Sequence, residues 1–200
     1  MANRIRTERA AAFAALALLF ALLTACALSP QAVSVNPEIT AADLPPGLDR
    51  RVALSVTDAR PGTVLGSRGG VYADTAAIST GPGFPGGIRD ALVARLTGAG
   101  YAVVGPDSAA ELSMRVQVAS LDYAIEAGAP PKKLSVGTRL VMTVRAGGDE
   151  YRGEGKVSRE RDVLKSPSEA TNEGMVNEVV SMALGDLLAD ERLHAWLQAH

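Results

Sequence analysis

The chain has 200 residues, of which 47% are hydrophobic and 21% are charged, and its formal net charge at pH 7 is −2. This length favours one domain with appendages. The lack of a basic excess argues against a nucleic-acid partner. A single cysteine cannot form an internal disulfide, so its role depends on its sequence context.

The N-terminus has the pattern of an export signal. Three arginines precede a run of 14 apolar residues, 10–23. A basic segment followed by such a run is typical of a signal peptide. We therefore predict a cleaved signal peptide over residues 1–25. A retained signal anchor is the alternative, because weak apolar character continues to Leu28 and a run of about 19 residues is near the minimum for a membrane span.

The residues that end this segment resemble a bacterial lipobox. Leu23, Thr24 and Ala25 are an aliphatic residue and two small ones that fit a narrow peptidase site, and Cys26 follows them. The resemblance implies that the signal peptidase recognises these three residues and that Cys26 is diacylated through its sulfur. Two or more acyl chains anchor a protein stably. A free buried thiol is the alternative, and we expect no cofactor other than the covalent lipid on Cys26.

The residue after the cysteine indicates to which of the two membranes such a lipoprotein is sorted. Ala27 stands where an aspartate would retain a lipoprotein in the inner membrane. In two-membrane bacteria the resemblance then implies an outer-membrane lipoprotein that faces the periplasm. We expect residues 26–49 to be the lipidated N-terminus and a tether, because their prolines oppose a helix, with a short extended piece over 33–35. Residues 50–200 are expected to form a single periplasmic α+β domain.

The first half of this domain combines a strand, a long loop and a helix. Residues 51–58 alternate apolar and polar side chains, which predicts a half-buried strand. Residues 59–87 hold eight glycines and three prolines and are predicted to be mostly loop, with a strand over 71–78. Apolar spacing predicts a helix over 88–101, and a short strand follows over 101–104.

Apolar and polar residues alternate more regularly in the second half of the domain. Three strands are predicted over 111–123, 134–146 and 150–163, the last two joined by a tight turn. Ser166, Pro167 and Glu169 resemble a capping box with Ser166 as the N-cap. They predict a helix that ends near Leu188 and is followed by an amphipathic segment over 191–198. This order of elements predicts an α+β fold, a two-layer sandwich of an antiparallel or mixed sheet with two main helices.

One loop carries a candidate site. Asp58 ends the first predicted strand and Arg60 follows two residues later. A loop of about 30 residues in a compact domain is unusual and often functional. We consider Asp58 and Arg60 a partner or ligand loop, and a structural turn held by local Asp–Arg pairing is the alternative.

No other residues form a catalytic or metal-binding pattern. The two histidines, His194 and His200, lie near the C-terminus without clustered ligands, whereas a metal site needs three or four. The serines do not occur in a G-x-S-x-G motif. We therefore predict no catalytic residues, no metal and no enzymatic activity.

Several segments together resemble a known family, the YajG-type lipoproteins of Gram-negative bacteria. They are "VSVNPEIT" (33–40), "VALSVTDARPGTVLGSR" (52–68), "RDALVARLTGAGYAVVGP" (89–106) and "VNEVVSMALGDLLADERLHAWL" (176–197). The resemblance implies a lipid-anchored envelope protein with a compact α+β domain and no assigned activity.

These observations lead to two functional hypotheses. The first is a non-enzymatic interaction module on the periplasmic side of the outer membrane, with an envelope protein or cell-wall partner. The alternative is a carrier of a lipid or another apolar ligand, which requires a cavity of several hundred cubic ångströms.

Overall fold

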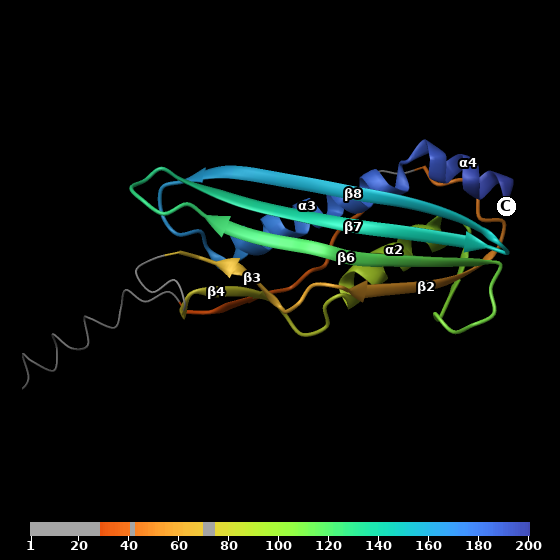
Figure 1. Cartoon of the computed structure of the whole chain (residues 1–200), viewed down its shortest axis with the longest axis horizontal. Coiled ribbons are helices and arrows are strands. Elements are labelled where there is room, and N and C mark those ends of the chain that lie inside the picture. The colour runs from red at the N-terminus through yellow and green to blue at the C-terminus, as the bar shows by residue number, and fades with distance from the viewer. Residues whose placement is uncertain (1–28, 41–42, 70–74) are drawn as a thin grey trace, which may run out of the picture.

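The computed structural model describes residues 29–40, 43–69 and 75–200. In this part of the chain an eight-stranded mixed sheet is covered on one face by helices, which confirms the predicted two-layer α+β fold (Figure 1). The helices are α2 (Gly86–Gly98), α3 (Glu169–Leu188) and α4 (Glu191–Ala199). The strands are β1 (Gln31–Val33), β2 (Arg51–Asp58), β3 (Val64–Ser67), β4 (Ala77–Thr80), β5 (Ala102–Val104), β6 (Leu112–Ile125), β7 (Lys132–Ala146) and β8 (Asp149–Val163).

Three long antiparallel strands, β6, β7 and β8, form the largest part of the sheet. Their side chains alternate between buried and exposed, as the sequence predicts, because one face packs on the helices and the other meets water. Gly147 adopts a φ of +57° in the tight turn between β7 and β8. Among the strands that the structure describes, β8 pairs with β7 alone, so its charged end over 158–162 lies on a sheet edge.

The β6 strand has two different neighbours along one edge. Its first half pairs in parallel with β2, up to Asp58 opposite Val118. Its second half pairs with β3 through Gly66 opposite Tyr123. The chain between β2 and β3, residues 59–63, therefore crosses the gap between two strands that share β6, and this placement creates the candidate site.

The segment 59–87 contains more regular structure than the sequence predicts. It holds β3 and β4, which pair antiparallel with each other, and β4 pairs in parallel with β1. Of the strand predicted over 71–78, residues 71–74 lie outside the described residues, 75 and 76 are not in a strand, and 77 and 78 belong to β4. These strands are too short to show a pattern in the sequence, and their pairing depends on distant partners.

Two of the three described helices, α2 and α3, begin two residues away from the prediction, whereas α4 begins at residue 191 as predicted. The α3 helix begins two residues later than predicted, because Ser168 rather than Ser166 is the N-cap and its side chain accepts from the Thr171 amide. The α2 helix begins at Gly86 instead of residue 88. Asp190 caps α4 and also accepts a hydrogen bond of 2.8 Å from the Tyr151 hydroxyl, which ties this helix to β8.

The N-terminal segment packs along α3, where the sequence analysis expected a tether. The strand predicted over 33–35 is shifted to β1, and Val33 and Val35 are buried. Beyond β1, alternate backbone amides donate to side chains that lie four residues apart on α3: Ser34 to Glu173 (3.2 Å), Asn36 to Asn177 (2.7 Å) and Glu38 to Ser181 (3.0 Å). We call these contacts the α3 ladder. The two spacings match, because two residues of an extended segment and four residues of a helix both advance about 6–7 Å along their axes.

The core lies between the sheet and the helices and is filled by side chains. Fully buried residues come from every layer, including Leu54, Leu92, Met114, Leu140 and Leu184. None of the helices in the described part of the chain is long and apolar enough to span a membrane.

Candidate functional site

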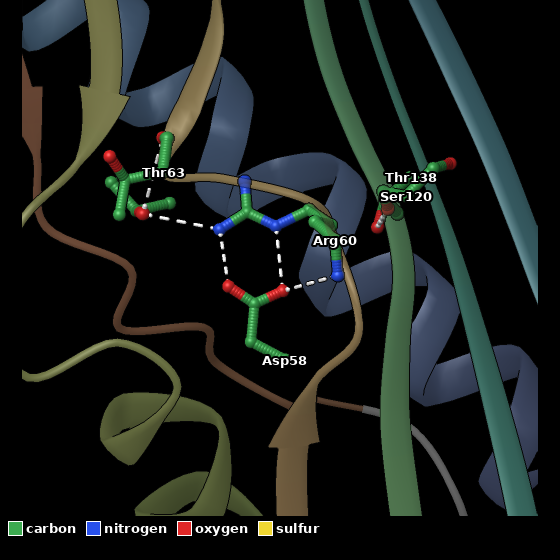
Figure 2. A network of polar contacts seen from close by, with 6 residues as sticks. Asp58, Arg60, Thr63, Ser120 and Thr138 are labelled. Carbon is green, nitrogen blue, oxygen red and sulfur yellow. Dashed lines mark hydrogen bonds and ion pairs between the residues drawn. The ribbon is translucent and has the colours of Figure 1, made fainter.

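The candidate site is built on an ion pair at the end of β2. The Arg60 guanidinium makes two parallel hydrogen bonds to the Asp58 carboxylate, Nε to Oδ1 at 2.9 Å and Nη2 to Oδ2 at 2.8 Å. The Arg60 backbone amide donates to the same Oδ1 at 3.1 Å. Figure 2 shows the two side chains facing each other in this arrangement. The local pairing that the sequence suggested is therefore present.

Arg60 also reaches the segment that leads into α2. Its Nη2 donates to the Thr80 hydroxyl at 3.2 Å, and the guanidinium lies over the Phe84 ring at 4.6 Å from the ring centroid. Only 4% of the Arg60 side chain is exposed. Its Nη1 is buried and has no hydrogen-bond partner among the described atoms. Arg60 therefore connects the end of β2 to the end of β4, and we call the Asp58–Arg60–Thr80 contacts the β2 clamp.

The electrostatics of the β2 clamp favour a structural ion pair. The hydrogen bond from the Arg60 side chain lowers the pKa of Asp58, and this effect exceeds the opposing effect of burial. Asp58 therefore stays a carboxylate at neutral pH. A carboxylate whose two oxygens both accept from one guanidinium is poorly suited to act as a general acid or base.

The loop held by the β2 clamp is exposed. Residues 61–63 and Val64 are open to solvent, and Val64 is 62% exposed although it is a large apolar residue. Leu65, the next residue, is buried and fixes the start of β3. The clamp thus presents a short exposed segment, residues 59–64, in a fixed position beside β6; it consists of the loop 59–63 and Val64, the first residue of β3. Such a surface can bind a partner without any chemical step.

The histidines have local structural contacts. His194 Nε2 lies 2.6 Å from the Leu188 carbonyl oxygen, where it links the start of α4 to the end of α3. His200 contacts the Trp196 carbonyl and the Asp149 carboxylate, and these contacts raise its pKa. Within the described residues, no group of three or more histidine, cysteine or acidic side chains could hold a metal ion.

The predicted lipidation site lies outside the described residues. This holds for Cys26 and for the predicted recognition residues Leu23, Thr24 and Ala25, which stay predictions. The first described residue, Ser29, follows Cys26 by three positions.

The sequence reasoning missed a buried arginine, Arg68, that contacts Ser29, the first described residue. Arg68 is 7% exposed. Its Nη1 donates to the Ser29 carbonyl at 3.0 Å and its Nη2 to the Pro167 carbonyl at 3.5 Å. In the sequence Arg68 stands in a glycine-rich stretch that resembles a flexible loop. Only its partners, which are distant in sequence, show that it fixes the N-terminus to the start of α3.

The family of this chain follows from a family model described as "Uncharacterized lipoprotein", which matches residues 37–198. The match includes β2, the β2 clamp, the long hairpins and all three described helices. The chain belongs to this family of lipoproteins. Membership confirms the lipoprotein assignment made from the resemblance. No curated protein is significantly similar to this lipoprotein in sequence.

Several solved structures are similar to this lipoprotein. The crystal structure of protein XCC0632 from Xanthomonas campestris has a TM-score of 0.52 and 13% identity, with 86% of this chain and 98% of that chain covered. A putative neuraminyllactose-binding hemagglutinin homolog from Helicobacter pylori has a TM-score of 0.46 and 10% identity, with 81% and 97% covered. A minor lipoprotein from Acinetobacter baumannii has a TM-score of 0.41 and 9% identity, with 77% and 94% covered. At 13% identity the likeness to the Xanthomonas campestris protein concerns the fold alone.

Proposed function

We propose that this lipoprotein is anchored through lipid on Cys26 to the periplasmic side of the outer membrane and acts there as a non-enzymatic interaction module. Membership of a lipoprotein family supports the lipid anchor. The lipobox-like residues 23–26 supply the attachment point, and Ala27 favours the outer membrane. The partner is an envelope protein or a cell-wall component.

The observation that carries the interaction role is the contrast between the β2 clamp and its loop. Arg60 is almost fully buried in the clamp, whereas the loop that follows exposes Val64 to solvent. Holding an exposed loop in one conformation lowers the entropy cost of binding a partner. The clamp thus favours the interaction role over an enzymatic one, because the Asp58 carboxylate and the Arg60 guanidinium pair with each other and neither is free to act on a substrate.

The carrier alternative has less support from the packing. The interior between the sheet and the helices is filled by fully buried side chains. Two hollows beside the N-terminal segment have volumes of about 280 Å³ each and open to solvent. A ligand carrier needs an apolar cavity that encloses most of its ligand, and these surface hollows do not provide one.

The anchor is tested by labelling cells with radioactive palmitate and separating the two membranes. We expect label in the wild-type protein, its recovery in the outer-membrane fraction, and loss of both in Cys26→Ser. Label that persists in Cys26→Ser, or a wild-type protein found in the inner membrane, would contradict the proposed anchoring.

The interaction surface is tested by photo-crosslinking in living cells with a probe in place of Val64. The control probe replaces Leu48, which is 82% exposed and lies outside the loop. We expect a discrete adduct at position 64, none at position 48, and loss of the adduct when Arg60→Ala releases the loop. Equal adducts at both positions would argue against a specific surface.

A further inference from the structure

The first observation concerns how little chain separates the lipid from the folded body. Three residue steps join Cys26 to Ser29, and an extended chain covers at most about 10 Å in that number of steps. Ser29 is itself held, because Arg68 donates to its carbonyl at 3.0 Å. The body can therefore move only a short distance from the lipid.

The chain after Ser29 supplies no additional slack. Gln31 donates from its side chain to the Glu169 carbonyl at 3.1 Å and accepts from Asn172 at 2.8 Å. Further along, the α3 ladder holds the backbone from Ser34 to Glu38. The lipid is thus attached to one particular end of the molecule, the end where α3 begins.

The same end of the molecule carries two exposed loops. Lys132 at the start of β7 pairs with Val163 at the end of β8, so the loop 126–131 and the residues after Val163 lie side by side. Pro167, which follows them, is joined to Ser29 through Arg68. We call residues 126–131 and 164–166 the anchor end; they lie at the left of Figure 1, where β6 and β8 finish.

The anchor end is exposed and partly apolar. Leu164 is 77% exposed, which is unusual for a leucine in a compact domain. The neighbouring loop 126–131 adds small apolar side chains and two prolines, all exposed. Lys132, Lys133 and Lys165 flank these residues, and three carboxylates, Glu160, Glu126 and Asp162, lie close enough to Lys133 to raise its pKa. An apolar tip beside lysines is the arrangement found on proteins that rest in a membrane interface.

We propose that the anchor end lies on the lipid surface of the membrane, with the Leu164 side chain at the boundary between headgroups and acyl chains. This inference rests on the proposed lipidation of Cys26. The balanced charges imply that contact depends on the apolar side chains more than on anionic lipid.

The orientation has a consequence for the rest of the molecule. The β7 and β8 strands have 15 residues each, which corresponds to about 50 Å at roughly 3.3 Å per residue. Leu48 lies three residues before β2, whose first residues pair with the start of β6, at the end of the sheet opposite the loop 126–131. Residues 59–64 lie beside β6 between Val118 and Tyr123, about 10–25 Å along the strand from the loop 126–131 at roughly 3.3 Å per residue. They therefore stay clear of the lipid surface and free to meet a partner.

The test measures how close Leu164 is to lipid in the full lipidated protein. A Leu164→Cys variant receives an environment-sensitive fluorophore and is reconstituted in vesicles of phosphatidylethanolamine and phosphatidylglycerol that contain a spin-labelled quencher lipid. Leu48→Cys is the matched control, because it is also a highly exposed leucine but at the far end. Ala129→Cys is a second probe in the anchor end.

We expect the lipid quencher to reduce fluorescence severalfold more at positions 164 and 129 than at position 48. Equal quenching at the two ends, or no quenching at position 164 in a protein that floats with the vesicles, overturns the inference and leaves the proposed anchor intact. A wild-type protein that does not float with the vesicles overturns the anchor and the inference together.

Discussion

Two buried arginines, Arg60 and Arg68, hold the irregular parts of this lipoprotein together. Arg60 is paired with a carboxylate, and Arg68 is held by the carbonyls of Ser29 and Pro167. A guanidinium suits both tasks because its planar array of donors satisfies several acceptors at once. Each arginine therefore connects segments that have no regular hydrogen-bond ladder between them.

The β2 clamp predicts a pH-dependent stability. Because the folded-state pKa of Asp58 is lowered, its stabilising effect is present above its ordinary pKa of 3.8 and is lost as the pH falls through the folded-state value. At pH 7 we expect Asp58→Asn to reduce the free energy of unfolding by about 1.5–3 kcal/mol, typical of a charged hydrogen bond. Urea unfolding at pH 7 and at low pH measures the difference. A difference that does not shrink at low pH would contradict this assignment.

A second residue-scale prediction concerns Asn172, which is fully buried. Its side chain accepts from the Tyr123 hydroxyl and donates to Gln31, both at 2.8 Å. Asn172→Ala leaves buried polar groups without partners, so we expect a loss of about 2–4 kcal/mol in the free energy of unfolding. Tyr123→Phe removes one hydrogen bond and leaves a single buried acceptor, Asn172 Oδ1, unpaired, so it should cost less, about 1–2 kcal/mol. Similar losses for the two variants in urea titrations would show that the network is not buried as described.

At the scale of elements, the packing of α3 on β8 depends on Gly155. A Cβ atom at this position would collide with the Ala183 carbonyl and press on Leu187. We expect Gly155→Ala to push the helix away from the sheet and reduce the free energy of unfolding by about 1–3 kcal/mol. Gly148 in the neighbouring turn has open space around it. Gly148→Ala should therefore leave the thermal midpoint nearly unchanged, and an equal effect of both variants would contradict this packing.

The α3 ladder makes another prediction at this scale. Asn177 accepts from the Asn36 amide and donates to the Ser34 carbonyl. Asn177→Ala removes both bonds, so we expect faster hydrogen exchange of the Asn36 amide and a loss of about 1–3 kcal/mol in the free energy of unfolding. The control is Glu178→Ala, whose half-exposed ion pair with Arg159 should contribute less than about 1 kcal/mol. Unchanged exchange at Asn36 would mean that the segment is held by other contacts.

The elements differ in how well the sequence predicts them, for a physical reason. The strands β6, β7 and β8 were predicted because one buried face imposes an alternating pattern over many residues. The cap of α3 was misplaced by two residues because Ser166 and Ser168 are equally suitable caps in sequence, and only packing selects between them. The short strand β3 was missed and β4 was only partly covered by the predicted strand, because four residues do not establish a period.

At the scale of the whole molecule, the short link between lipid and body sets the orientation. Inserting about 12 glycine and serine residues between Leu28 and Ser29 lengthens the reach by roughly 20 Å for a flexible chain. We expect the thermal midpoint to stay unchanged, because the insertion precedes the packed residues. The quenching of a Leu164→Cys probe by lipid should fall relative to the unextended protein. Undiminished quenching would mean that the anchor end binds lipid strongly without help from the short link.

The sequence by itself determined the features that depend on residues close together in the chain. These are the lipoprotein assignment, the alternating strands, the long C-terminal helix and the pairing of Asp58 with Arg60 two residues away. The tertiary structure alone decided how the N-terminal segment is held. The Asn36–Asn177 contact joins residues that are 141 positions apart, and the Arg68–Pro167 contact spans 99. Such contacts leave no local period or motif, because either partner alone resembles an ordinary polar residue in a loop or on a helix surface.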